Sequence, residues 1–196
     1  MSNVQQIGED LQFVRQAVAR GRHPARGPAS IYWLWAVYVL AGYALIDFDR
    51  PASGWFFMIG GILGGIASWQ LGKRWALRTG EYDLEMARRG MLHWGGGIIL
   101  AVASALALCA VNPPLRQGAY SGQMVVVLIG MVYFLGGVHF DRNFLWLGPL
   151  LMAGGVLVGF VPRYGWTALG AVIALGLVIP TLFPAGGTAG TVEQSA

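Results

Sequence analysis

Three side chains in this sequence could form a metal site or a proton-sensitive switch: His93, His139 and Asp141. Imidazole nitrogens and carboxylate oxygens are common ligands of divalent metals, and imidazole changes its charge between about pH 5 and pH 8. Alternatively, both histidines are hydrated or bonded to nearby backbone, and Asp141 pairs with the adjacent Arg142. If two neighbouring antiparallel helices carry these residues, we expect all three at the same, inner face of a membrane.

The sequence contains no recognisable catalytic motif. It lacks His-Glu-x-x-His, Gly-x-Ser-x-Gly and a phosphate-binding glycine loop. A single Cys109 excludes an intrachain disulfide and a cysteine metal cluster. We therefore predict a protein without enzymatic activity and without a cofactor.

The elements that position these residues are expected to be membrane helices. Of the 196 residues, 56% are hydrophobic and only 11% are charged. The apolar residues fall in long runs rather than in alternation, which is typical of transmembrane segments. The sequence has thirteen basic and nine acidic residues. In a membrane protein this balance indicates topology and contact with the lipid bilayer rather than nucleic-acid binding.

The apolar runs predict an all-α, polytopic integral membrane protein with six transmembrane helices arranged as three hairpins. Each run is close to the length of about 20 residues that crosses the hydrocarbon core. The predicted spans are residues 30–48, 53–72, 93–112, 119–139, 143–161 and 164–183. The corresponding division of the chain is a cytoplasmic amphipathic helix and basic linker (1–28), the transmembrane domain (29–183) and a disordered cytoplasmic tail (184–196).

The first and third hairpins are predicted to be an internal repeat. Tryptophan, proline and glycine recur at a constant offset of 111 positions, and both tryptophan and proline are uncommon. The matching positions are Leu34-Trp35 with Leu145-Trp146, Pro51 with Pro162, Gly54-Trp55 with Gly165-Trp166, and Gly65 with Gly176. Each copy contains two spans, so both copies have the same orientation in the membrane.

The N-terminal segment has a stripe of apolar residues at alternating spacings of three and four: Val4, Ile7, Leu11, Val14 and Val18. This spacing predicts an amphipathic helix that lies on the membrane surface or on the cytoplasmic ends of the helix bundle. The alternative is a short coiled coil, through which the chain contacts a protein partner or a second copy of itself.

The basic residues predict the orientation. With a cytoplasmic N-terminus, ten of the thirteen lie on the inside, five of them between Lys73 and Leu92, and only Arg50, Arg116 and Arg163 lie outside. The positive-inside rule then places both termini in the cytoplasm. We predict a multi-pass protein of a bacterial-type plasma (inner) membrane.

Three charged residues, Asp47, Asp49 and Arg50, fall between the first two spans. They can pair with one another and meet water, so we assign them to a turn at the outer face rather than to a gate. The equivalent positions of the second copy are Val158, Phe160 and Val161.

Small residues inside the spans predict close helix packing, because lipid supplies no hydrophobic force that brings helices together. Two overlapping Gly-x-x-x-Gly patterns occur in the second span and one in the fifth. The residues are Gly60, Gly61, Gly64, Gly65, Gly155 and Gly159.

These features favour a small multi-pass inner-membrane protein of non-enzymatic structural, regulatory or stress-sensing type. The alternative is a small transporter or channel subunit that moves a small solute or ion. Internal repetition and thirty glycines favour the alternative. The scarcity of polar groups near the middle of the spans argues against it.

Overall fold

The computed structural model describes residues 27–80, 83–116, 120–161 and 163–183. Within these ranges the chain is helical and has no strand. The N-terminal apolar stripe and the tail of residues 184–196 lie outside the described residues, so the predictions made for them stay predictions.

The described helices follow one another through short connections. They are α2 (Ala29–Phe48), α3 (Arg50–Thr79), α4 (Leu84–Met91), the π-helical turn η1 (Leu92–Gly96), α5 (Gly97–Val111), the 3-10 turn η2 (Pro113–Arg116), α6 (Tyr120–His139), α7 (Phe144–Leu157), the 3-10 turn η3 (Val158–Phe160) and α8 (Gly165–Leu182).

Five helical segments are long and apolar enough to cross a membrane, which identifies a membrane-embedded protein. They are Ala29–Phe48, Arg50–Thr79, Leu84–Val111, Tyr120–His139 and Gly165–Leu182. The remaining apolar segment, Phe144–Phe160, has 17 residues and ends in the 3-10 turn η3.

The second and third membrane helices extend well beyond their predicted ends. The α3 helix runs to Thr79 and ends at Gly80, whose φ of 70° is the left-handed conformation that glycine adopts without strain. The α4 helix begins after Asp83, whose carboxylate accepts hydrogen bonds from the backbone N–H groups of Glu85 (2.8 Å) and Met86 (3.3 Å). The described part of the polar segment between the second and third predicted spans, Lys73 to Leu92, is therefore mostly helical.

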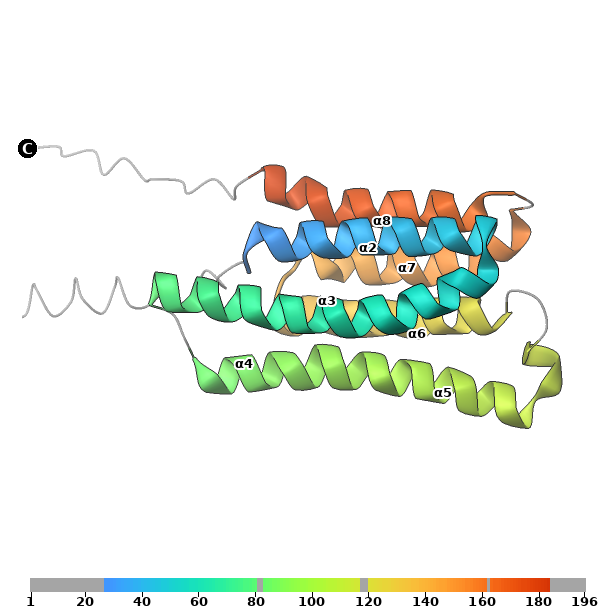
Figure 1. The fold of residues 1–196 in the computed structure, drawn as a ribbon, viewed down its shortest axis with the longest axis horizontal. Coiled ribbons are helices and arrows are strands. Elements are labelled where there is room, and N and C mark those ends of the chain that lie inside the picture. Colours follow the sequence, from blue (N-terminus) through green and yellow to red (C-terminus); the bar gives the residue numbers. More distant parts are fainter. Residues whose placement is uncertain (1–26, 81–82, 117–119, 162, 184–196) are drawn as a thin grey trace, which may run out of the picture.

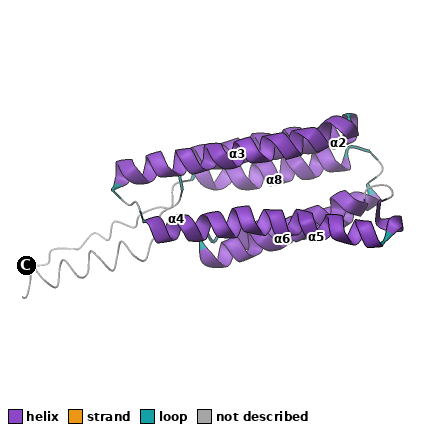
Figure 2. Ribbon diagram, turned by 60° about the horizontal axis from the view of Figure 1, so that its bottom comes forward, coloured by secondary structure: helices purple, strands orange, loops and turns teal. Residues whose placement is uncertain are grey.

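The helices form two layers of three (Figures 1 and 2). In one layer α2 lies between α3 and α8, and in the other α6 lies between α5 and α7. The most extensive helix contacts are α6 with α7 and α2 with α8. The helices of the third predicted hairpin, α7 and α8, make a smaller contact that joins the two layers.

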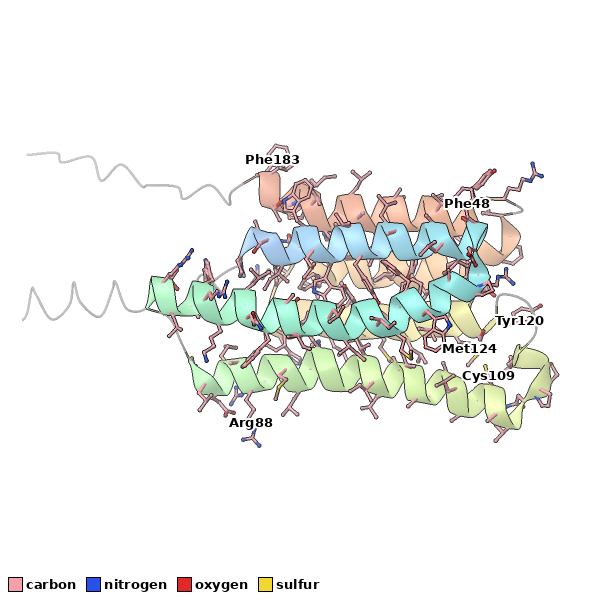
Figure 3. All side chains as sticks on the ribbon, viewed as in Figure 1. Phe48, Arg88, Cys109, Tyr120, Met124 and Phe183 are labelled. Carbon is pink, nitrogen blue, oxygen red and sulfur yellow. The ribbon has the colours of Figure 1, made fainter. Side chains whose placement is uncertain are left out.

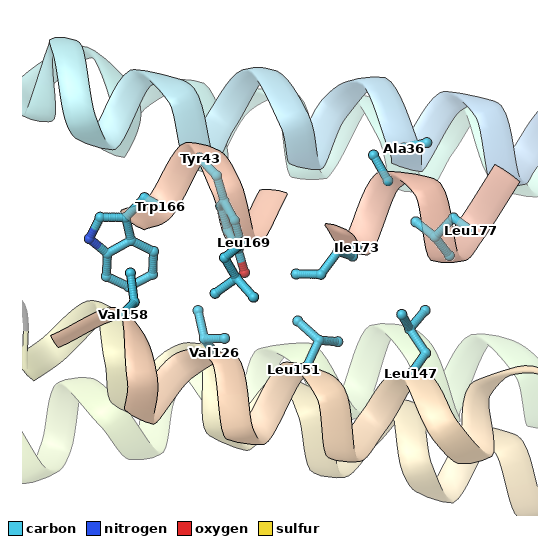
Figure 4. Close-up of a cluster of buried hydrophobic side chains, with 11 residues drawn as sticks. Ala36, Tyr43, Val126, Leu147, Leu151, Val158, Trp166, Leu169, Ile173 and Leu177 are labelled. Atoms are coloured by element: carbon cyan, nitrogen blue, oxygen red, sulfur yellow. The ribbon is translucent and has the colours of Figure 1, made fainter. Parts of the chain in front are cut away.

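The hydrophobic core lies between the layers and is built mainly by α7 and α8 (Figure 4). Leu147 on α7 and Ile173 on α8 are each 1% exposed. Most large apolar side chains of α3 and α5 remain exposed, as expected for helices that face lipid at the edges of the layers.

Candidate functional site

His93, His139 and Asp141, the candidates for a metal site or a switch, lie at the end of the bundle where α6 connects to α7. We call this the α6–α7 end. His93 belongs to the turn η1, where the helix from Leu84 to Val111 widens for one turn. Such π turns inside α-helices are frequent at functional sites. His93 Nε2 lies 3.1 Å from the backbone oxygen of Val132 on α6. A carbonyl oxygen only accepts, so this contact assigns the imidazole proton to Nε2.

His139 is the last residue of α6, and its ring lies near that of His93. The two ring centroids are 6.1 Å apart, and the rings are perpendicular. Gly136 makes this approach possible, because a Cβ atom at this position would lie 2.8 Å from the Trp94 ring and 3.1 Å from His93 Nε2. The structure therefore brings the two predicted histidines together.

Asp141 is engaged by other partners. The hydroxyl of Tyr32, on α2, donates to its Oδ2 at 2.6 Å. The backbone N–H of Asn143 donates to Oδ1 at 3.0 Å, and the Asn143 side-chain amide donates to Oδ2 at 3.3 Å. The carboxylate thus holds the α6–α7 turn and ties it to α2.

The geometry does not assemble the three residues around one ion. His93 Nε2 donates to the Val132 carbonyl, so Nδ1 is the ring nitrogen left for a metal, and the Asp141 carboxylate accepts hydrogen bonds from Tyr32 and Asn143. Within the described ranges, no group of three histidine, cysteine or acidic residues is arranged to hold a metal. The pairing of Asp141 with Arg142 is also not observed, since the ion pair between described residues is Arg89 with Glu85, at 3.0 Å.

Aromatic rings surround the polar groups at the α6–α7 end. Trp94 contacts the rings of Tyr133 and Phe144, each at a centroid distance of 5.1 Å. Phe144 also stacks on Tyr32 at 5.9 Å. Residues from α2, η1, α6 and α7 therefore meet in one cluster. Tyr32 had no recognisable signal in the sequence, because it is 109 positions away from Asp141.

The opposite end of the bundle has a second polar tie. Oδ2 of Asp47, near the end of α2, accepts from both the backbone N–H and the hydroxyl of Thr167, each at 2.7 Å. Thr167 lies in the first turn of α8, so Asp47 caps that helix from a neighbouring one. Asp49 caps its own helix, α3, by accepting from the Ala52 N–H at 3.1 Å. These acidic residues therefore hold helix ends rather than pair with Arg50.

Five of the six predicted packing glycines meet side chains of neighbouring helices. Gly60 and Gly61 lie against Tyr38 of α2, and Gly64 lies against Trp35. A Cβ atom at Gly65 would have no such neighbour within 4 Å. In the fifth predicted span, Gly155 faces Val126 and Val127 of α6, and Gly159 faces Gln123.

The closest approach between helices, that of α6 to α7, involves glycines outside the predicted Gly-x-x-x-Gly patterns. A Cβ atom at Gly130, Gly137 or Gly148 would come within 3.0 Å of backbone atoms of the facing helix. These three residues let the backbones of α6 and α7 touch. They are not spaced as a Gly-x-x-x-Gly motif on one helix, because Gly148 belongs to the other helix of the pair.

The fold and these contacts define an all-helical, membrane-embedded protein whose helices are tied together at both ends of the bundle. No family model, curated protein or solved structure matches this chain.

Proposed function

We propose that the chain crosses the membrane six times, with Phe144–Phe160 as the shortest span. This segment has 17 residues, at the lower end of the range of about 17–25 that crosses a bilayer. Its antiparallel contact with α6 and the turns at both of its ends support a full crossing. With this span included, successive connections alternate between the two ends of the bundle.

We also propose that the first and third hairpins are repeats. In each one, a tryptophan of the first helix packs on a glycine of the second: Trp35 on Gly64, and Trp146 on Gly176. The constant offset of 111 positions pairs the two tryptophans, and it pairs Gly176 with Gly65, the neighbour of Gly64. The same type of contact therefore recurs within one residue of the expected register.

The proposed orientation puts the α6–α7 end in the cytoplasm of a bacterial-type cell. The described basic residues support this, because the ends of α3 and α4 and Arg142 lie at that end, whereas Arg50 and Arg163 lie at the other. Both termini are assigned to the cytoplasm in this proposal. The N-terminal apolar stripe is assigned to the membrane surface, a protein partner or a second copy.

For function, we propose a non-enzymatic membrane protein of structural, regulatory or stress-sensing type. The observation that carries this proposal is the internal pairing of the polar groups between the helices. Trp35 Nε1 donates to Ser68 Oγ at 2.9 Å, and the Tyr38 hydroxyl donates to the Phe57 carbonyl at 2.8 Å. Ser53, the buried polar side chain of the described residues, bonds within its own helix to the Arg50 carbonyl at 2.7 Å.

A solute pathway presents polar groups to its cargo, whereas a rigid or signalling bundle uses them between helices. The second arrangement fits the described helices, in which no buried side-chain nitrogen or oxygen lacks a partner. The ties at the two ends join α2 to the α6–α7 turn and to α8, so a displacement of α2 would be transmitted to both layers.

A flux measurement on the full-length protein in liposomes tests this proposal. Vesicles loaded with dyes that report protons or potassium should leak no faster than protein-free vesicles, and glycerol should not swell them faster. Gramicidin provides the positive control. A flux that increases with the amount of protein would contradict the proposal and support the alternative, a transporter or channel subunit.

A further inference from the structure

The α3 helix projects past the membrane at the α6–α7 end. It contains 30 residues, about 45 Å of helix, against a hydrocarbon core of about 30 Å. Counted from Arg50, about 20 residues bring the helix to the far side of the core. Lys73 and Arg74 follow within about 6 Å of helix rise, at the depth of the lipid headgroups.

The helix that leads into α5 projects at the same end. Leu84–Val111 contains 28 residues, or about 42 Å of helix. Counted back from Val111, about 20 residues reach the neighbourhood of Leu92. Arg88 and Arg89 lie about 5–6 Å beyond it. Two separate helices thus place basic residues at the same depth.

Most of these basic side chains are exposed and have no ionic partner among the described residues. Lys73, Arg74, Arg78 and Arg88 are exposed, and none of them forms an ion pair within the described ranges. Figure 3 shows Arg88 pointing away from the bundle. Of the nearby carboxylates that the structure describes, Glu85 pairs with Arg89 and Asp83 caps α4.

Exposed apolar side chains lie among the basic ones. Leu84 is 70% exposed and Met91 is 63% exposed. The contacts of α4 are mainly with the turn η1, which continues the same helix. The Lys73 ammonium lies 5.6 Å from the centre of the exposed Trp69 ring. Basic groups with apolar and tryptophan side chains at one depth are suited to a lipid interface.

From this arrangement we propose that the projecting ends of α3 and α4 bind the headgroups of anionic phospholipids. The phosphate groups accept hydrogen bonds from Arg74 and Arg88, while the exposed Met91, at the membrane end of α4, meets the acyl boundary. An acidic soluble protein would match the charges, but it would not cover Met91 at the acyl boundary. This surface does not depend on the function proposed above.

Native mass spectrometry of the full-length protein in detergent tests the proposal, with phosphatidylglycerol and phosphatidylcholine as probes. The wild-type protein should prefer phosphatidylglycerol, and the preference should fall as salt rises. In Arg74→Gln/Arg88→Gln, the affinity ratio should decrease about fivefold for each charge removed.

Two matched variants separate this surface from general charge effects. Arg50→Gln/Arg163→Gln removes the same charge at the opposite end and should leave the ratio unchanged. Arg74→Lys/Arg88→Lys keeps the charge and should keep the preference. The proposal is overturned by a wild-type protein without preference, by an equal loss in the opposite-end variant, or by a glutamine variant that binds as wild type does. Should the glutamine variant fail to fold, the opposite-end variant and the salt dependence still decide.

Discussion

Two helix pairs of this bundle use glycine in different ways. Between α6 and α7, the glycines let one backbone touch the other, as at Gly148, where a Cβ atom would lie 2.5 Å from the Phe134 nitrogen. Between α2 and α3, the glycines make room for aromatic rings, as at Gly60, where a Cβ atom would lie 2.8 Å from the Tyr38 ring. A backbone contact cannot yield without moving a helix, whereas a ring can rotate. The same glycine-rich composition therefore supports one rigid contact and one adaptable contact.

The largest expected effect comes from adding a methyl group to the rigid contact. Gly148→Ala should lower the free energy of unfolding by about 3 kcal/mol, at the upper end of the cost of overpacking, because α7 must move away from α6. Thermal unfolding in detergent measures this change. Gly65→Ala is the matched control, since its Cβ would meet no atom of a neighbouring helix within 4 Å. Equal melting temperatures of both variants would contradict the backbone contact.

A smaller effect is expected at the adaptable contact. Gly60→Ala should cost about 1 kcal/mol, because Tyr38 must rotate or shift. A double-mutant cycle with Tyr38→Ala isolates the interaction: in that background the alanine should cost little or even stabilise α3 through its higher helix propensity. An undiminished cost without the Tyr38 ring would show that another neighbour resists the methyl group.

The sequence was sufficient to predict the helical fold and several helix ends. The first span was predicted at 30–48 and is Ala29–Phe48, and the last was predicted at 164–183 and is Gly165–Leu182. Hydrophobicity predicts these ends because the apolar run and the helix end at nearly the same residue. At α3 they do not stop together: charged residues begin at Lys73, yet the helix continues to Thr79.

The candidate site was predictable only in part. Helix connectivity was enough to bring His93 and His139 to one end, because consecutive antiparallel helices must be neighbours. Connectivity gives no information on Tyr32, since the contact between α2 and the α6–α7 turn depends on how the two layers face each other. For the same reason, Asp47 was recognised as a turn residue but not as the cap of α8.

The short segment Phe144–Phe160 determines the number of spans and the sidedness of the α7–α8 connection, and we propose that it crosses the membrane. Arg142 and Arg163 flank the segment and lie on opposite sides in the proposed topology. Each can be replaced singly by cysteine in a Cys109→Ala background, which removes the one native cysteine.

Labelling of these two cysteines with a membrane-impermeant maleimide in intact cells, and again after permeabilisation, is the most direct measurement. We expect the cysteine at position 163 to react in intact cells and the cysteine at position 142 to react only after permeabilisation. Identical behaviour of the two positions would show that Phe144–Phe160 does not cross, and it would contradict the six-span account.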